Sequence, residues 1–291
     1  MLRKLILIFA WSTAFCSFSQ STYITTQNNG EGREVEETDE GQFVLGNKLY
    51  SGAIFKNWTR EDLPCERGEA KNGNRNGNWQ FFYMGGALKK EGNYNNSYPM
   101  GGWVKYYFSG ETEETYSYDL NGQKDGSFLA YYKNGEKKEE GLFLTGSKDG
   151  TFTSYFKGGK LKEVRTFIKG DKNGAFLTYY ESGKLKSEEN YQLNLKEGNF
   201  IQTFPSGKKR IEENYENNLR SGAYFKYYEN DSIELSSFYT LGNENGLNLK
   251  FYSNGDSSRV RIYEEGRKKV NLPLIRMAAE RDTKSLMKKV K

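Results

Sequence analysis

An internal repeat of 24 residues constrains the fold of this chain more than any other feature. Eight glycines follow one another at intervals of 24 residues, with a single interval of 25, and each of them opens a repeat. The opening glycines are Gly77, Gly101, Gly126, Gly150, Gly174, Gly198, Gly222 and Gly246. A fixed period of this length is typical of repeat architectures, in which each repeat is one small structural unit that packs on its neighbours.

Each repeat has the pattern of a β-hairpin. Counted from the opening glycine as position 0, position +2 is aromatic in seven repeats, and positions +6 and +17 are aromatic in all eight. Position +9 is glycine in seven repeats and completes dipeptides such as Asn134-Gly135, which lie between two β-prone runs and are typical of a tight turn. The opening glycine should therefore lie opposite position +17, and we expect that ring to cover the glycine backbone.

Alternation along each strand assigns the side chains to two faces. Positions +2, +6 and +17 are predicted to share a buried face of stacked rings. The other face carries an aromatic column at position +5, and we expect the basic residues at position +12 to lie over these rings. The predicted interaction face consists of Tyr106, Tyr131, Tyr155, Tyr179, Tyr227, Lys138, Lys162, Lys186 and Arg210.

A second basic series occupies the turns between repeats. Its members are Lys124, Lys148, Lys172, Lys196 and Arg220. Acidic residues alternate with them and would largely cancel their field. We therefore interpret this series as solvated turn residues rather than as a binding edge.

The chain is predicted to have five segments. Residues 1–19 have the basic start, apolar run and small residues of a signal peptide, with cleavage after Ser19, and residues 20–40 form a disordered acidic leader. Residues 41–76 form a degenerate N-terminal capping repeat, and residues 77–265 form the eight repeats. Residues 266–291 form a C-terminal capping helix, because apolar residues after Pro273 recur at a helical period. The expected fold is all-β, an elongated single-layer antiparallel array of β-hairpin repeats with a short C-terminal helix.

The residue inventory argues against an enzyme. There is no histidine, which removes the usual catalytic triads and the commonest metal ligand. Glutamates such as Glu140 and Glu188 recur once per repeat, as partners of nearby lysines would, rather than as one catalytic pair. We predict no catalytic, cofactor-binding or metal-binding residue. The formal net charge of +5, of which Arg3 and Lys4 supply two units, is too small to indicate a nucleic-acid partner.

The repeats resemble a known family. Segments such as GSFLAYYKNGEKKEEGLF and GAFLTYYESGKLKSEENY are similar to the variant MORN (membrane occupation and recognition nexus) repeat common in bacteria, over residues 77–265. The resemblance implies a sheet of hairpins used for protein association and, in some members, for lipid contact. Similar bacterial chains are often grouped as antitoxin-like.

Several functions stay open at this point. We expect an exported monomer, periplasmic, outer-membrane-associated or secreted, that acts as a scaffold for another protein in the cell envelope. A binder of carbohydrate or cell-wall glycan is an alternative, because rows of tyrosines can stack on sugar rings. An anionic-lipid binding module and an antitoxin or immunity protein are further alternatives.

Overall fold

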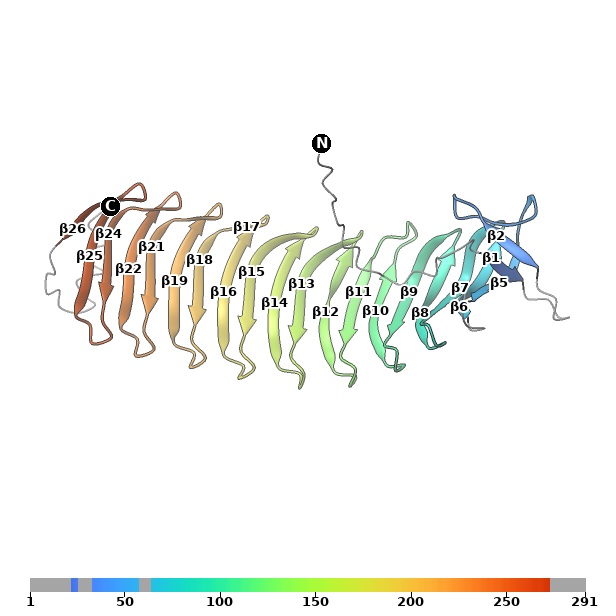
Figure 1. The fold of residues 1–291 in the computed structure, drawn as a ribbon, viewed down its shortest axis with the longest axis horizontal. Coiled ribbons are helices and arrows are strands. Elements are labelled where there is room, and N and C mark those ends of the chain that lie inside the picture. Colours follow the sequence, from blue (N-terminus) through green and yellow to red (C-terminus); the bar gives the residue numbers. More distant parts are fainter. Residues whose placement is uncertain (1–21, 26–32, 58–63, 273–291) are drawn as a thin grey trace, which may run out of the picture. The chain divides into compact units, whose positions relative to one another are not determined.

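The computed structural model describes residues 22–25, 33–57 and 64–272, and these residues form strands, turns and loops without a helix. They divide into two compact units, unit 1 up to Gln123 and unit 2 from Lys124 onward (Figure 1). Strands that follow one another in the chain pair in antiparallel fashion, as in β7–β8 and β13–β14. The prediction of an all-β array of hairpins is therefore confirmed.

Unit 1 contains the first ten strands. Their bounds are β1 Thr22–Thr25, β2 Glu34–Glu37, β3 Phe43–Leu45, β4 Lys48–Leu49, β5 Gly52–Asn57, β6 Pro64–Lys71, β7 Asn74–Phe82, β8 Leu88–Asn95, β9 Tyr98–Tyr106 and β10 Thr112–Tyr118. From β5 onward each strand pairs with the next one in the chain, while β1 pairs with β2 and with β5. The N-terminal strands therefore cover the edge that β5 would otherwise leave open.

Unit 2 is a single sheet whose strands lie side by side in chain order (Figure 1). Their bounds are β11 Gly126–Tyr131, β12 Lys137–Leu144, β13 Ser147–Tyr155, β14 Leu161–Ile168, β15 Asp171–Tyr179, β16 Leu185–Gln192, β17 Leu195–Lys196, β18 Gly198–Thr203, β19 Lys209–Glu216, β20 Leu219–Arg220, β21 Gly222–Tyr227, β22 Ile233–Thr240, β23 Asn243–Glu244, β24 Gly246–Phe251, β25 Ser257–Glu264 and β26 Arg267–Leu272. The described strands of unit 2 all belong to this layer.

The predicted register of the hairpins is confirmed, but the expected role of the opening glycine is wrong. Gly150 pairs with Phe167, as position 0 with position +17. A β-carbon at Gly150 would meet no atom within 4 Å, so no ring covers this glycine, and its φ of +71° is the reason for glycine there. The opening glycine therefore serves backbone geometry rather than packing.

Within the eight repeats, two glycines at position +15 lie directly under rings. A β-carbon at Gly92 would overlap the indole of Trp103, and one at Gly141 would stand 2.5 Å from the ring of Phe152. In both cases the ring belongs to position +2 of the following repeat. These close approaches pack one repeat directly onto the backbone of the one before it.

Rings at positions +2 and +17 form a ladder along one face, which we call the ladder face. In unit 2 each ring contacts the next, with centroid separations of 5.7, 5.5, 5.6, 5.5 and 4.8 Å along the series Phe128, Phe143, Phe152, Phe167, Phe176 and Tyr191. Most of these contacts are edge-to-face, the geometry that the ring quadrupole favours. The predicted face of stacked rings is thus present at these two positions.

The basic series of the inter-repeat turns lies on this ladder, so our interpretation of it as solvated turn residues is wrong. The ammonium of Lys148 lies 4.2 Å from the ring centroid of Phe152 and 5.6 Å from that of Phe167. Lys124, Lys172, Lys196 and Arg220 each lie over the corresponding two rings. The cause is the inter-repeat pairing, in which Phe143 faces Lys148 on the same side of the sheet.

The expectation of a disordered leader over residues 20–40 is wrong for the part that the structure describes. Tyr23 in β1 and Val35 in β2 are fully buried and pack with Phe43, Ile54 and Trp79 in the core of unit 1. The acidic residues have partners too. Arg75 approaches Glu37 at 3.5 Å and Glu66 at 3.3 Å. A few apolar residues and one half-buried cation, Arg75, thus offset the polar composition of this segment.

The C-terminal segment differs from the prediction in its first part. Arg267–Leu272, assigned above to a capping helix, form strand β26 and pair with β25. The rest of that predicted helix, residues 273–291, and the predicted signal peptide, residues 1–19, lie outside the described residues. A strand here extends the repeat pattern because β25 still offers a free edge after the last hairpin.

Replacing Gly92 by Ala tests the ring-on-backbone packing. Gly92→Ala should lower the stability of unit 1 by about 1–3 kcal/mol, because the new methyl group would push the Trp103 ring from its place. Gly102→Ala is the matched control, since a β-carbon there meets nothing within 4 Å. Tryptophan fluorescence during urea unfolding reports on unit 1, because Trp11, Trp58, Trp79 and Trp103 all precede Gln123. Equal destabilisation by both substitutions would contradict this packing.

Replacing Lys148 tests the cation on the ladder. Lys148→Gln should destabilise β13 and β14 by about 0.5–2 kcal/mol, because it removes the charge above two rings, and Lys148→Arg should retain most of the stability. Hydrogen exchange of the β13 and β14 amides, followed by mass spectrometry, measures this local effect. Lys169→Gln at the exposed neighbouring turn is the control and should change little.

Candidate interaction face

The face opposite the ladder carries the tyrosine column that we predicted as an interaction face, and we call it the second face. It is formed by positions +3, +5 and +14, as shown by the pairing of Leu129 with Glu140 and of Glu140 with Thr153. Tyr131, Tyr155 and Tyr179 stand on it half-buried in successive repeats of unit 2. Tyr106 occupies the same position in unit 1.

Three of the tyrosines at position +5 donate hydrogen bonds to a glutamate at position +14 of the preceding repeat. The hydroxyl of Tyr155 donates a hydrogen bond of 2.5 Å to Oε1 of Glu140, whose Oε2 accepts one of 2.7 Å from Lys137. Tyr106 donates to Glu91 at 2.8 Å and Tyr227 to Glu212 at 3.0 Å in the same way. A glutamate on the neighbouring hairpin thus orients Tyr106, Tyr155 and Tyr227, whereas position +14 before Tyr131 is Thr115 and position +14 before Tyr179 is Val164.

These contacts fix the protonation states of the group. The hydrogen bond to Glu140, together with burial, raises the pKa of Tyr155 above its ordinary value. Hydrogen bonds from Lys137 and Tyr155 lower the pKa of Glu140. At neutral pH the face therefore presents a neutral phenol beside a paired carboxylate and ammonium. This arrangement suits hydrogen bonding and ring contact with a partner.

The structure separates the four predicted basic residues from this column. Lys138 lies 6.0 Å from the ring of Tyr132, and Lys162, Lys186 and Arg210 each lie 5.9 Å from the ring at position +6 of their own repeat. The expectation that they lie over the rings at position +5 is therefore wrong. The physical reason is a β-bulge, because Ala130 faces Glu139 but Tyr131 already faces Lys137. The extra residue shifts the alternation at Lys138.

Two basic residues that do accompany the column were missed by the sequence reasoning. Lys137 lies 6.0 Å from the ring of Tyr155 and bonds Glu140, and Lys209 approaches Glu212 at 3.2 Å. Both stand at position +11, which is lysine only in these two repeats. Only the position of the bulge, which is not apparent in the sequence, would have identified them.

The aromatic residues at position +6 link successive hairpin tips. Tyr132 donates a hydrogen bond of 2.7 Å to the carbonyl oxygen of Tyr155, and Tyr180 donates one of 2.8 Å to that of Thr203. Tyr83 and Tyr228 make the same bond to the repeats that follow them. This column therefore has a structural role at the edge of the sheet rather than a place in the ring ladder.

Tyr227 differs from the other predicted tyrosines. Its side chain is only 8% exposed and belongs to an apolar cluster with Ile233, Leu249, Phe251 and Val260. It is a core residue of the last repeats, so the structure removes it from the predicted interaction face. The half-buried members in unit 2 are Tyr131, Tyr155 and Tyr179.

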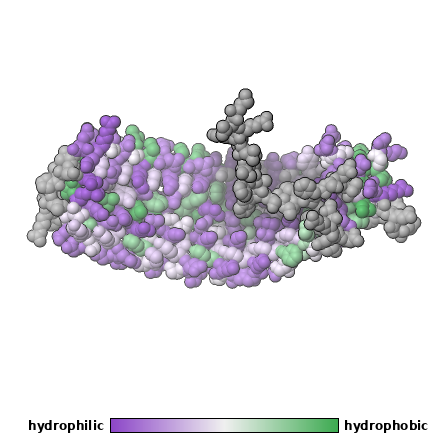
Figure 2. All heavy atoms as spheres, in the orientation of Figure 1, coloured by the Kyte–Doolittle hydropathy of each residue, from purple (hydrophilic) through white to green (hydrophobic). Residues whose placement is uncertain are grey.

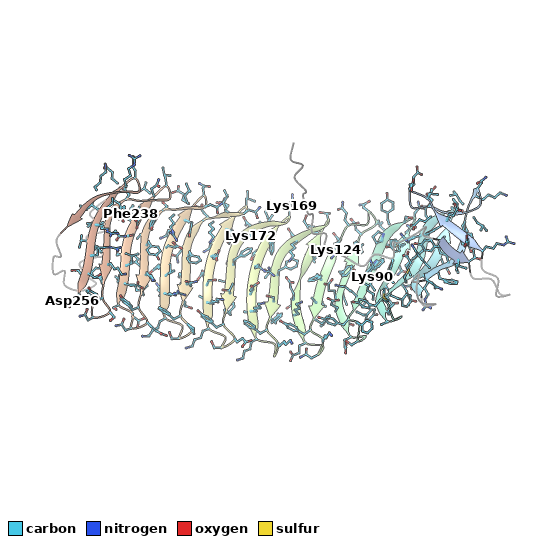
Figure 3. All side chains as sticks on the ribbon, in the orientation of Figure 1. Lys90, Lys124, Lys169, Lys172, Phe238 and Asp256 are labelled. Carbon is cyan, nitrogen blue, oxygen red and sulfur yellow. The ribbon has the colours of Figure 1, made fainter. Side chains whose placement is uncertain are left out.

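The inter-repeat turns of unit 2 form an apolar margin that the sequence reasoning also missed. One aliphatic residue on each of five successive turns is between 45% and 70% exposed: Leu144, Ile168, Leu193, Leu219 and Leu241. Figure 3 places Lys169, on one of these turns, at one edge of the sheet and Asp256, at a hairpin tip, at the opposite edge. Hydrophilic side chains otherwise predominate on the visible surface (Figure 2).

Residues 22–25, 33–57 and 64–272 contain no cluster of three or more histidine, cysteine, aspartate or glutamate side chains suited to a metal ion. Within the same ranges no helix could cross a membrane. Cys65 is buried, at 5% exposure.

Comparison with known proteins identifies the repeat. Three segments match the family model for the MORN repeat variant: residues 75–96, 148–169 and 172–193. A search of curated proteins finds no match to the chain. Each matched segment begins at a cation of the ladder, Arg75, Lys148 or Lys172, and continues through both strands of one hairpin. The chain therefore contains repeats of the MORN variant type.

Proposed function

We propose that this chain is an exported, non-enzymatic scaffold that binds another protein through the second face of unit 2. MORN repeats suggest a repeat-based module for protein binding or membrane association. One observation carries the choice of this face. One tyrosine per repeat lies half-buried at the same position of the second face: Tyr131, Tyr155 and Tyr179. The rings of the ladder face, in contrast, already pack against one another and against lysines.

The chemistry of the face fits a protein partner. Tyrosine provides a large and rigid contact area, and it is enriched at protein interfaces. In unit 2 the neighbouring positions are Leu129, Thr153, Leu177 and Ile201, so the row is mostly apolar, with one hydroxyl at Thr153. A row with one phenol per repeat has a spacing of about 10 Å, set by two strands. An extended polypeptide or a sheet edge can follow such a row over several repeats.

Export is supported by the sequence of residues 1–19, with its basic start, apolar run and small residues. The absence of histidine from the whole chain and the pairing of the recurrent glutamates support a non-enzymatic role. The periplasm, the outer membrane or the exterior is the location we propose.

A second candidate function is association with a membrane surface, and the apolar margin of unit 2 favours it. Leu193 and Leu241 are 59% and 70% exposed at its turns. Aliphatic side chains along one edge of a rigid sheet can enter the boundary between lipid headgroups and acyl chains. The margin and the second face are formed by different residues, so one experiment separates the two candidates.

Binding through the second face is tested by cross-linking in the native host followed by mass spectrometry. Replacing Tyr131, Tyr155 and Tyr179 together by Ser should abolish recovery of a specific protein, because the three rings provide the contact area. Replacing Leu144, Ile168 and Leu219 by Ser is the matched control and should leave that recovery intact. Loss of binding only in the margin variant, or recovery of lipid or glycan alone, would overturn the proposal. Amide exchange of both variants verifies that they are folded.

Export is tested by the N-terminus of the mature protein. We expect cell fractionation to place the chain outside the cytoplasm, and N-terminal peptide mass spectrometry to find Gln20 as its first residue. A chain that starts at Met1 and remains in the cytoplasm would contradict this part of the proposal. Replacement of Leu5 and Leu7 by Arg is a useful comparison, because two charges within the apolar run of the signal peptide should stop export.

A further inference from the structure

The ring ladder of unit 2 ends before the hairpin of β24 and β25. Position +2, which carries a ring of the ladder in the other hairpins of this unit, is Asn248 here. The cation that lies over two rings elsewhere is replaced by Glu244. The carboxylate of Glu244 accepts hydrogen bonds from Ser237, Tyr239 and Asn248. The ladder face therefore has a different chemistry over this hairpin.

Three basic residues stand on the ladder face of the same hairpin. Arg259 and Arg261 are two residues apart on β25, so their side chains point to the same side of the sheet. Asn248 pairs with Arg261 and fixes that side as the ladder face, and Lys250 of β24 pairs directly with Arg259. The side chains of Lys250, Arg259 and Arg261 are half-buried. We call these three residues the terminal cluster.

The terminal cluster places like charges opposite each other. Lys250 and Arg259 occupy the paired positions +4 and +13 of their hairpin. Within residues 124–272, the same pair of positions contains at most one charged residue in each of the other hairpins. Like charges that face each other across two strands repel and destabilise the sheet. The stability of the sheet therefore does not account for this pair.

The terminal cluster also lacks the carboxylates that other cations at its positions have. In earlier hairpins of unit 2, Arg165 at position +15 lies 2.7 Å from Glu139, and Lys226 at position +4 lies 2.8 Å from Glu234. Among residues 22–25, 33–57 and 64–272, no carboxylate forms an ion pair with a cation of the terminal cluster. Three positive charges thus stay unneutralised on one hairpin.

The two guanidinium groups are hydrogen-bonded to neutral oxygens. Nη2 of Arg259 donates to Oδ1 of Asn248 at 3.3 Å, and Nη1 of Arg261 donates to the hydroxyl of Tyr263 at 3.5 Å. The Nε atom of each arginine is buried, and it has no hydrogen-bond partner in the part of the chain that the structure describes. Partial removal of a cation from water is costly without a paired anion, and a bound carboxylate would offset this cost.

The spacing of the arginines selects the geometry of that anion. Residues two apart on a strand lie about 7 Å from each other, and alternate side chains of any other extended chain have the same spacing. An arginine can bind a carboxylate through two parallel hydrogen bonds. Acidic residues at alternate positions of an extended peptide would therefore meet Arg259 and Arg261 in register, with Lys250 beside the first contact.

We propose that the terminal cluster binds an extended acidic segment of a partner protein, with carboxylates of alternate residues on Arg259 and Arg261. The site lies on the ladder face, so it is separate from the tyrosines of the second face and goes beyond the function proposed above. The two faces of one sheet then bind different chemistry, phenol contacts on one side and carboxylates on the other.

The spacing is tested by fluorescence anisotropy with the full chain and two labelled peptides that contain the same number of glutamates. In the first peptide glutamate alternates with threonine. In the second, two threonines separate successive glutamates, which puts neighbouring carboxylates on opposite sides of an extended chain. We expect the alternating peptide to bind at least about tenfold more tightly, and its binding to weaken as salt is raised.

Two outcomes of this measurement contradict the proposal. Equal binding of the two peptides would show a basic surface without selectivity for spacing. Binding of phosphatidylglycerol vesicles without binding of the alternating peptide would assign the site to lipid headgroups instead.

Substitution of the arginines separates a binding role from a structural one. Arg259→Gln with Arg261→Gln should weaken binding of the alternating peptide at least about tenfold. Amide protection of β24 and β25 should stay the same or rise, because Lys250 no longer faces a like charge. Lys157→Gln with Lys169→Gln removes equal charge from exposed positions and should leave the binding intact. Unchanged binding by the arginine variant, or loss of amide protection in β24 and β25, would overturn the proposal.

Discussion

The packing of aromatic rings against the preceding hairpin, on its rings and, at Gly92 and Gly141, on its backbone, is the interaction on which the rest of this structure depends. A sheet of one layer has no opposing layer to bury its side chains, so the rings must find apolar contact within their own face. Trp103 over Gly92 and Phe152 over Gly141 achieve this because glycine leaves the backbone open. The contact joins residues eleven apart in the chain, so each repeat needs only its neighbour.

This packing gives the two faces different roles. On the ladder face, the rings pack edge to face and the lysines lie over them, so little ring surface is left for a partner. The contact between Lys148 and Phe152 is the closest of these cation–ring contacts. On the second face, Tyr155 is oriented by Glu140 but keeps part of its ring in solvent. A partner would therefore find preorganised phenols on a rigid support, which reduces the entropy lost on binding. The repeat that stabilises the sheet also sets the spacing of the proposed interaction sites.

The sequence predicted the fold well where one period or one pairing decides the structure. The 24-residue period, the hairpins and the pairing of Gly150 with Phe167 are such features. It failed where the outcome depends on contacts between distant residues, as with Tyr23, which packs against Phe43 and Trp79 in a segment of acidic composition. For the predicted interaction face the structure shows where the residues lie, and their role in binding stays a prediction. The tyrosine column is on one face, but a single bulge residue moved Lys138 to another column.

Deletion of one whole repeat tests the central claim most directly. Without residues 150–173, Phe176 should take the place of Phe152 over Gly141. Lys148 should then lie over the rings of Phe176 and Tyr191, where Lys172 lies in the full chain. We expect unit 2 to keep its amide protection on both sides of the junction, whereas deletion of twelve residues, 150–161, should abolish it locally, because it brings the two strands of a hairpin out of phase. Loss of protection to the same extent in both chains would contradict the account.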